Sequence, residues 1–436
     1  MVEQFENPDD VIINKVTISS LDNSHVSDIR ALVVSFEIVA GLGHTIYGSM
    51  ILGDGIGLFS PRTNAAIGEE FIEIEFKTRG ADNFLKYKFI ITDVTELGRS
   101  SQQDSVLMSL SLASIDYFIN NGTFISKSYK GNIHNIIQSI LETELKTEIP
   151  INTFNESDGE VKFAFTRNKP FEKIDLLKTY AYKNEQIPMN FFTFFENFSG
   201  YNFRTMSSMF EEEKDKPYAT YKYSPQASGN RDDRNIILEY LLPPSIDIQR
   251  KLYYGYFKTN VYSYDVFTKQ YQQRTYRLDQ TNNGENTNAE RGVSTQLASR
   301  LSNMGGLDYF IPQDTSNPNA LIDSTISISP YLLQLEENMI IIKIYGNSIL
   351  DVADIVNIEF PLLAPLTSTS IDVLDTSISG KYLVQKITHK IQMDDGGRYT
   401  YYSDVALIRN TSKTLQTTLD SRYSSNTISI RALQDG

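Results

Sequence analysis

Histidine and cysteine provide most metal ligands and many nucleophiles in proteins, and this chain has few of them. It contains no cysteine and four histidines, His25, His44, His134 and His389. Zinc sites place such ligands at short, regular spacings, whereas no two of these histidines are close in sequence. We therefore predict no metal site, no thiolate catalysis and no disulfide framework. We expect His134 on the surface of a helix and His389 on a strand, facing solvent.

Acidic side chains could form a cation site or a catalytic pair, and the chain has 54 Asp and Glu residues. Four of them, Glu69, Glu70, Glu73 and Glu75, gather in one short segment. Because Glu73 and Glu75 alternate with Phe and Ile, the pattern favours one solvated face of a strand. No pair of carboxylates suited to glycoside hydrolysis can be singled out among so many.

Two glycine-containing patterns could bind ions or phosphates. The Asp-Asp-Gly-Gly sequence at 394–397 resembles part of a calcium loop but lacks the later acidic ligands, so it is typical of a tight turn. Neither glycine cluster near the start fits a phosphate-binding motif that opens a helix, and both predict turns between strands. These clusters are Gly41 with Gly43, and Gly53 with Gly55 and Gly57.

The stretch from Tyr253 to Tyr276 interleaves tyrosines with basic residues. This composition is found on surfaces that stack on single-stranded nucleic acid, but Tyr and Thr are also favoured in strands and form cross-strand pairs. The acidic balance of the chain favours the strand interpretation. The basic residues are Arg250, Lys251, Lys258, Lys269, Arg274 and Arg277. Taken together, the patterns predict no catalytic, cofactor-binding or metal-binding residue.

Length and charge narrow the class of protein. A chain of 436 residues can hold about two to four domains, and 40% hydrophobic residues indicate a globular protein. The formal net charge of −14 argues against a protein that grips duplex DNA, because neutralising phosphates requires Lys and Arg. The first residues lack a basic region followed by an apolar one, so we expect no signal peptide. No apolar run approaches the length of a membrane span.

Strand patterns dominate both ends of the chain, and helical patterns the middle. We predict an α+β, mainly β fold with two antiparallel β-barrel domains and an intervening α+β domain. In the middle, Asn132–Leu145 and Pro170–Ala181 have helical spacing, and Asn190–Phe203 predicts a hairpin. The expected divisions are 1–120 (first barrel), 121–235 (α+β), 236–410 (second barrel, with a long polar insertion at about 279–325) and 411–436 (extended tail).

A strand pair near the start recurs near the end. Ile67–Phe76 and Asp351–Phe360 both close on Ile-Glu-Phe, and each is followed by Lys-Tyr and an alternating run. Those second runs are Lys86–Leu97 and Lys381–Ile391. The first offset is about 284 residues and the second about 295. Two patterns in the same order at similar offsets indicate a duplicated β unit rather than an enzyme organised around one cleft.

Several segments resemble the central baseplate hub protein of contractile-tailed bacteriophages of the T-even type. They begin with Ser-Tyr-Lys-Gly-Asn-Ile-His at 128–134 and Lys-Pro-Phe-Glu-Lys-Ile-Asp at 169–175. The aromatic hairpin at 190–204, the tyrosine motifs within 247–265 and Gly-Lys-Tyr-Leu-Val at 380–384 complete the set. The likeness covers roughly residues 30–410 and leaves 281–325 and 411–436 without a counterpart.

The resemblance implies a structural virion protein of the phage tail, assembled in the host cytoplasm. It implies a homotrimer in which each chain contributes two tail-tube-like barrels, so that three chains give a pseudo-hexameric ring. Such a ring would join the sixfold tail tube to the threefold central spike, contact other baseplate proteins, and let DNA pass without specific binding. The resemblance implies no enzyme activity, no cofactor and no membrane partner.

Three alternatives remain open at this stage. The first is the equivalent hub of a phage-derived contractile injection system. The second is a tail-associated cell-wall hydrolase, for which no catalytic cluster stands out. The third is a monomeric carbohydrate-binding module that would use the aromatic surface.

Overall fold

The computed structural model describes most of the chain, and all structural statements refer to the described residues. These are 7–20, 25–58, 70–78, 80–99, 105–183, 191–212, 219–224, 234–242, 248–264, 269, 271–277, 307–312, 332, 335–336, 338–361, 374–375, 378–394 and 396–409. The predicted tail at 411–436 lies outside them. No helix in this part of the chain is long and apolar enough to cross a membrane.

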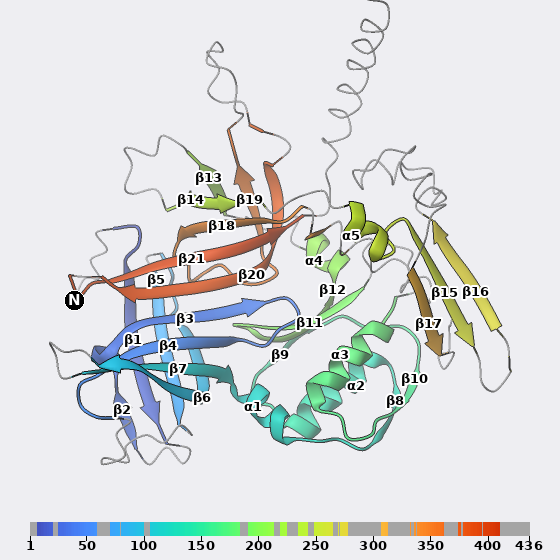
Figure 1. Ribbon diagram of the computed structural model, residues 1–436, viewed down its shortest axis with the longest axis horizontal. Helices are drawn as coiled ribbons and strands as arrows, with labels where there is room; N and C mark the ends of the chain where they lie inside the picture. Colours follow the sequence, from blue (N-terminus) through green and yellow to red (C-terminus); the bar gives the residue numbers. More distant parts are fainter. Residues whose placement is uncertain are drawn as a thin grey trace, which may run out of the picture.

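The fold is mainly β, and most of its strands belong to one 13-stranded sheet (Figure 1). The N-terminal strands are β1 (Val11–Ser19), β2 (Val26–Asp28), β3 (Val33–Gly41), β4 (Tyr47–Asp54), β5 (Phe71–Thr78), β6 (Leu85–Arg99) and β7 (Val106–Ser114), with a short 3-10 turn η1 (Arg30–Leu32). The later strands are β13 (Thr220–Tyr223), β14 (Ile236–Leu241), β18 (Ile340–Tyr345), β19 (Ile355–Glu359), β20 (Gly380–Met393) and β21 (Tyr399–Ile408).

The later strands form a six-stranded barrel. They follow the order β19-β13-β14-β18-β21-β20, and β20 pairs again with β19 to close the ring. We predicted an antiparallel barrel, and this is wrong for one strand, because β13 runs parallel to both β14 and β19. Strand β18 has the alternating burial expected of a barrel strand. Ile340, Ile342 and Ile344 are buried in the core, and the residues between them lie nearer solvent.

The N-terminal strands repeat most of this arrangement. Strands β5-β6-β7-β4-β3 are neighbours in that order, and every neighbouring pair is antiparallel. Strands β19-β20-β21-β18-β14 have the same order and the same pairing. In each set the chain visits the strands in the same sequence. The matching order supports the duplication inferred from sequence.

The repeated strand pair keeps its buried face but shifts its register. Glu75 lies opposite Lys86 in the first pair, whereas Asn357, not Glu359, lies opposite Lys381 in the second. The slip is therefore two residues. Because side chains alternate with a period of two, a slip of two keeps every apolar residue on the core side. Accordingly Ile72, Ile74 and Phe76 are buried, as are Val356, Ile358 and Phe360.

The two β units share one sheet and one core. Strand β3 of the first unit pairs antiparallel with β20 of the second along Ser35–Gly41. On the other side of the first unit, β1 pairs with β5 and β2, and no pairing of β1 with β3 is present among the described residues. The first unit is therefore a curved sheet whose edge strand β3 continues into the barrel. We predicted a closed barrel here as well, and this is wrong for the described residues, because β3 pairs with β20 instead of closing the sheet on itself. One apolar core runs through both units.

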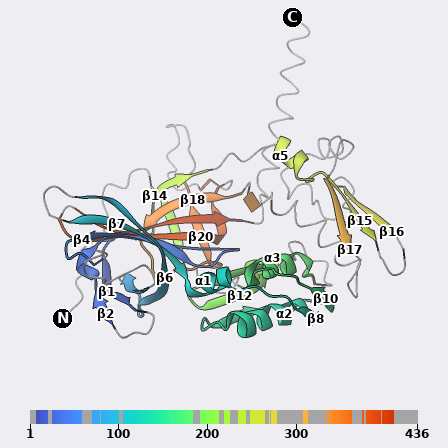
Figure 2. The same cartoon turned by 60° about the horizontal axis from the view of Figure 1, so that its bottom comes forward.

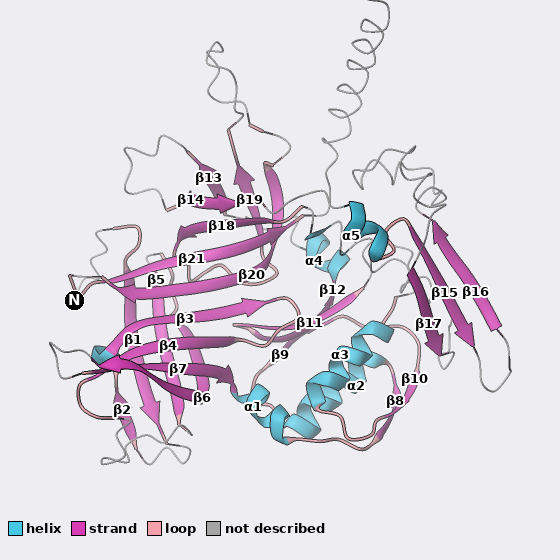
Figure 3. Ribbon diagram, viewed as in Figure 1, coloured by secondary structure: helices cyan, strands magenta, loops and turns pink. Residues whose placement is uncertain are grey.

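The middle of the chain has its own core and most of the helices (Figure 3). The helical elements are α1 (Ile115–Gly122), α2 (Ile133–Ser139) with a π-helical turn η2 (Ile140–Leu145), α3 (Pro170–Tyr180), α4 (Met206–Glu212) and α5 (Ile248–Tyr253). The small strands are β8 (Ser128–Gly131), β9 (Ile151–Phe154), β10 (Val161–Ala164), β11 (Phe192–Asn197) and β12 (Gly200–Thr205). The two predicted helices and the predicted hairpin are present. Gly200 has φ +125° and lies against Pro150, where only glycine fits.

A separate small sheet lies at one end of the molecule (Figures 1 and 2). It has the order β16-β15-β17, with β15 (Lys258–Tyr264), β16 (Tyr271–Arg277) and β17 (Leu307–Pro312). The predicted pair of tyrosine-rich strands is thus present as β15 and β16. Strand β17 lies within the polar insertion predicted at about 279–325, where we expected no strand, and most of that segment lies outside the described residues.

Candidate assembly site at the junction of the β units

The described residues hold no group of three or more His, Asp or Glu side chains that could bind a metal ion. The four histidines lie on separate elements. His25 precedes β2, His44 lies in the turn between β3 and β4, and His134 lies at the start of α2. His134 is only half exposed, and its backbone N–H donates to the Ser157 hydroxyl at 3.1 Å. The candidate site is instead the junction where the two β units and the α+β segment meet, and its residues are suited to assembly rather than to catalysis.

An aromatic cluster fills the junction between the two β units. The Phe76 ring on β5 packs against Phe36 on β3 at 5.7 Å and against Tyr401 on β21 at 5.5 Å between ring centroids. Tyr87 on β6 and His389 on β20 contact the same ring at 6.2 and 6.1 Å. The contact with Tyr87 is stacked and the other three are edge-to-face, and both arrangements add to the stabilisation from burial. The first unit therefore cannot move relative to the barrel without opening a shared core.

His389 does not face solvent, contrary to our prediction. Its side chain is buried on β20, and Nδ1 lies 2.6 Å from the Tyr401 hydroxyl. Burial lowers the pKa of His389 to about 4, so the imidazole is neutral at pH 7. The sequence contained the signal: His389 shares a strand face with Ile387 and Ile391, both of which are buried.

The β11–β12 hairpin connects the α+β segment to both β units through buried carboxyl groups. Glu196 on β11 is 7% exposed, and its Oε2 accepts a hydrogen bond from the Ile46 N–H at 3.0 Å. The Glu196 N–H donates in turn to the His44 carbonyl at 3.1 Å. At the hairpin turn, the Phe198 N–H donates to Asp351 Oδ2 at 3.2 Å. One hairpin thus contacts the first β unit and the segment leading into β19.

Burial raises the pKa values of these carboxyl groups. The pKa of Glu196 is raised to about 8 by burial, although the hydrogen bond from Ile46 opposes the shift. Burial also raises the pKa of Asp351 well above its usual value. Asp116 on α1 has a raised pKa from burial, and it accepts hydrogen bonds from Thr147 and, at 2.9 Å, from Tyr201. Burial at the junction therefore shifts all three carboxyl groups toward the protonated form.

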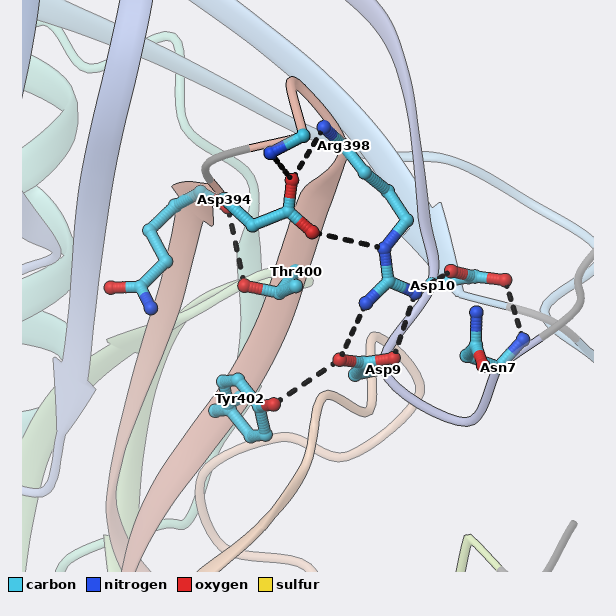
Figure 4. A network of polar contacts seen from close by, with 9 residues as sticks. Asn7, Asp9, Asp10, Asp394, Arg398, Thr400 and Tyr402 are labelled. Carbon is cyan, nitrogen blue, oxygen red and sulfur yellow. Dashed lines mark hydrogen bonds and ion pairs between the residues drawn. The ribbon is translucent and has the colours of Figure 1, made fainter. Parts of the chain in front are cut away.

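A second polar network joins the N-terminal segment to the β20–β21 turn (Figure 4). Arg398 donates to both oxygens of Asp9 at 3.2 Å, to Asp10 at 2.7 Å and to Asp394 at 3.3 Å. The Tyr402 hydroxyl donates to Asp9 at 3.2 Å, and the Tyr401 N–H donates to the Asp9 carbonyl at 2.9 Å. We call this network the Arg398 clamp. It connects residues almost 400 positions apart.

We expect Arg398→Ala to reduce the free energy of unfolding by about 1–2 kcal/mol at low salt, because the substitution leaves neighbouring carboxylates without their shared cation. Denaturant unfolding measures this loss, which should shrink at high salt. Arg99→Ala is the matched control, since Arg99 is 77% exposed and pairs with Glu96 on its own strand; it should lose no more than about 0.5 kcal/mol. Equal losses in the two variants would contradict a stabilising clamp.

The other sequence-predicted positions have structural roles. Glu73 pairs with Lys15, and Glu75 lies 3.3 Å from Lys86, on the partly solvated face of β5; Glu69 lies outside the described residues. Asp394 accepts backbone hydrogen bonds from Gly396 and Arg398, and the bond from Arg398 lowers the pKa of its carboxyl group. These contacts confirm an acidic strand face and a tight turn.

The geometry is that of a mainly β structural protein in which two related sheets share one core. The polar groups at the junction hydrogen-bond to neighbouring elements and hold them together. The sequence matches no model of a known protein family. It is 20% identical over 414 residues to the probable baseplate hub protein gp334 of Vibrio phage KVP40, covering 88% of this chain and 92% of that protein. The chain is thus a distant homologue of a phage baseplate hub protein, and the resemblance stated from sequence is confirmed.

Two solved structures are similar over most of the chain. One is the 43 kDa tail protein of prophage MuSo2 from Shewanella oneidensis, with a TM-score of 0.45, 10% identity, and coverage of 91% of this chain and 97% of that one. The other is the E. coli c3393 protein, a component of the type VI secretion system, with a TM-score of 0.40, 9% identity, and coverage of 93% and 78%.

Proposed function

We propose that this protein is a non-enzymatic, trimeric baseplate hub of a phage tail. The observation that carries the proposal is the repeated strand order within one chain, together with distant homology to a baseplate hub protein over 88% of the sequence. Two related β units in each of three chains give six units in a ring. A ring of this kind has threefold symmetry in its chains and approximate sixfold symmetry in its sheets.

This arrangement supplies a mechanism for joining parts of unequal symmetry. The sixfold face of the ring would receive the tail tube, and the threefold face would receive the central spike and other baseplate proteins. The proposed divisions are 1–120 and 236–410 for the tube-like domains, 121–235 for the α+β domain and 411–436 for the tail, which lies outside the described residues. Strand β13 (Thr220–Tyr223) lies before the boundary at 236 and is counted with the second tube-like domain, because it pairs with β14 and β19. The acidic balance of the chain fits a channel through which DNA passes without being held.

The cohesion of the junction supports the proposal. A ring that transmits force between tube and spike needs its two β units fixed relative to each other. The paired strands β3 and β20, the aromatic cluster around Phe76 and the Arg398 clamp all fix them.

The mass of the purified protein in solution tests the proposal. We expect sedimentation equilibrium to give about three times the chain mass of 49.5 kDa. A monomer at all concentrations, both alone and after co-expression with the tail spike protein of the same phage, would contradict a trimeric hub. Lysis of cell walls in a zymogram would contradict the non-enzymatic assignment.

A further inference from the structure

The small sheet of β15, β16 and β17 has one buried and one open face. Thr259 and Val261 on β15 are fully buried, next to the buried rings of Tyr256 and Phe257. None of these residues belongs to either of the two large apolar cores. The sheet is therefore a satellite with its own small core, and Figures 1 and 2 show it apart from the main sheet.

The open face carries tyrosines and amides. Tyr264 and Tyr271 lie opposite each other in the β15–β16 register and are 49% and 58% exposed. The Tyr271 ring stacks on Tyr262 at 6.2 Å. Next along the hairpin, the Thr275 hydroxyl donates to Asn260 Oδ1 at 2.9 Å. Rigid tyrosines beside short polar side chains are typical of protein-binding surfaces, because they bury a large area at small entropic expense.

The hairpin is also basic within an acidic protein. Between Lys258 and Arg277 the sequence contains four basic residues and one acidic residue, whereas the whole chain has a net charge of −14. The basic positions are Lys258, Lys269, Arg274 and Arg277. In the register, Lys258 and Arg277 share the face of Tyr264 and Tyr271, whereas Arg274 lies opposite the buried Val261 on the other face. The remainder of each molecule is therefore more acidic than the total, and a second copy offers a complementary surface.

We propose that the open face of the β15–β16 hairpin docks on the acidic body of a second copy of this chain. The inference rests on the proposed trimer. A ring with threefold symmetry needs a head-to-tail contact, in which two different surfaces of each chain meet. A basic, tyrosine-rich hairpin at one end of an acidic body supplies two such surfaces.

Single-stranded nucleic acid is the competing occupant, because tyrosines and basic residues also suit it. We favour the second copy because the proposed ring requires two different surfaces of each chain to meet, and the hairpin and the acidic body supply such a pair. The test below includes this competitor as an outcome.

The first experiment compares two double variants of the full chain. Tyr264→Ala with Tyr271→Ala should weaken association of copies at least tenfold in sedimentation velocity, with an unchanged far-UV circular dichroism spectrum. Tyr47→Ala with Tyr117→Ala is the matched control, since these tyrosines are 44% and 46% exposed on other elements, and it should associate like the original protein. Reversing charge with Lys258→Glu and Lys269→Glu should also weaken association, most strongly at low salt.

A photo-crosslinker placed at Tyr271 identifies the occupant directly. In a mixture of isotope-labelled and unlabelled protein, we expect crosslinks between copies, to peptides rich in Asp and Glu. Crosslinks only within one chain would overturn the inference. So would tight binding of a single-stranded oligonucleotide that is lost in the Tyr264→Ala, Tyr271→Ala variant. If the protein forms trimers that the hairpin variants leave intact, the inference fails and the proposed function stands. If the unaltered protein forms no trimer, both fail.

Discussion

Gly346→Ala should abolish the native fold of the barrel or destabilise it by about 4 kcal/mol or more. A Cβ atom at Gly346 would lie 2.0 Å from Cγ of Tyr401 and within 2.4 Å of two other ring atoms. The Tyr401 ring cannot withdraw, because it packs against Phe76 and His389 in the shared core. The Gly346 N–H also donates to the Tyr401 carbonyl at 2.8 Å, which holds the two backbones together.

Circular dichroism and denaturant unfolding of the variant measure this effect. Gly53→Ala is the matched control, because the nearest atom to a Cβ there is a Val34 methyl group at 3.7 Å, an ordinary contact. The control should change the free energy of unfolding by less than about 1 kcal/mol. Native stability of Gly346→Ala within about 1 kcal/mol of the original protein would show that the ring and strand can separate, and would contradict a tightly packed junction.

Glu196→Gln should make the protein more stable at high pH. The folded pKa of Glu196 is about 8, above its ordinary value of 4.5, so the fold favours the protonated carboxyl group. As pH rises from 4.5 to 8, the unfolded chain loses this proton while the folded chain keeps it, and stability falls. The loss approaches about 4–5 kcal/mol at pH 9, at about 1.4 kcal/mol per pKa unit. Glutamine cannot ionise, and its oxygen can still accept the Ile46 N–H.

Urea unfolding between pH 5 and pH 9 tests this prediction. We expect the two proteins to differ by less than about 1 kcal/mol at pH 5 and the variant to be more stable by about 4 kcal/mol at pH 9. Glu75→Gln is the control, because the side chain of Asn14 donates a hydrogen bond that lowers the pKa of Glu75, and that variant should gain nothing at high pH. A pH-independent difference for Glu196→Gln would contradict a buried, protonated carboxyl group.

Local patterns in the sequence predicted much of the secondary structure. Pro170 opens α3, and a hairpin occupies 192–205, as spacing and turn residues indicated. The repeated Ile-Glu-Phe and Lys-Tyr pairs fall on β5–β6 and β19–β20, the corresponding strands of the two units. Alternation of side chains with a period of two is a local property, and it survives even the two-residue shift in register.

Long-range pairing could not be predicted in the same way. The parallel pairing of β13 with β19 joins segments more than 130 residues apart in sequence, and local propensity does not specify such partners. The Arg398 clamp joins residues separated by 389 positions, which no spacing pattern reveals. Glu196 looked like any polar strand residue, because its burial comes from the β3–β4 turn that packs over it. Contact with an element that is distant in sequence is therefore the common reason why these positions were missed.

Electron microscopy of the purified protein tests the central claim most directly. Two related β units per chain should give end-on class averages of a closed ring with a central channel. The ring should have threefold symmetry at high resolution and approximate sixfold symmetry at low resolution. Single particles without a ring, or rings whose chains follow any symmetry other than threefold, would contradict the account of this protein as a trimeric hub.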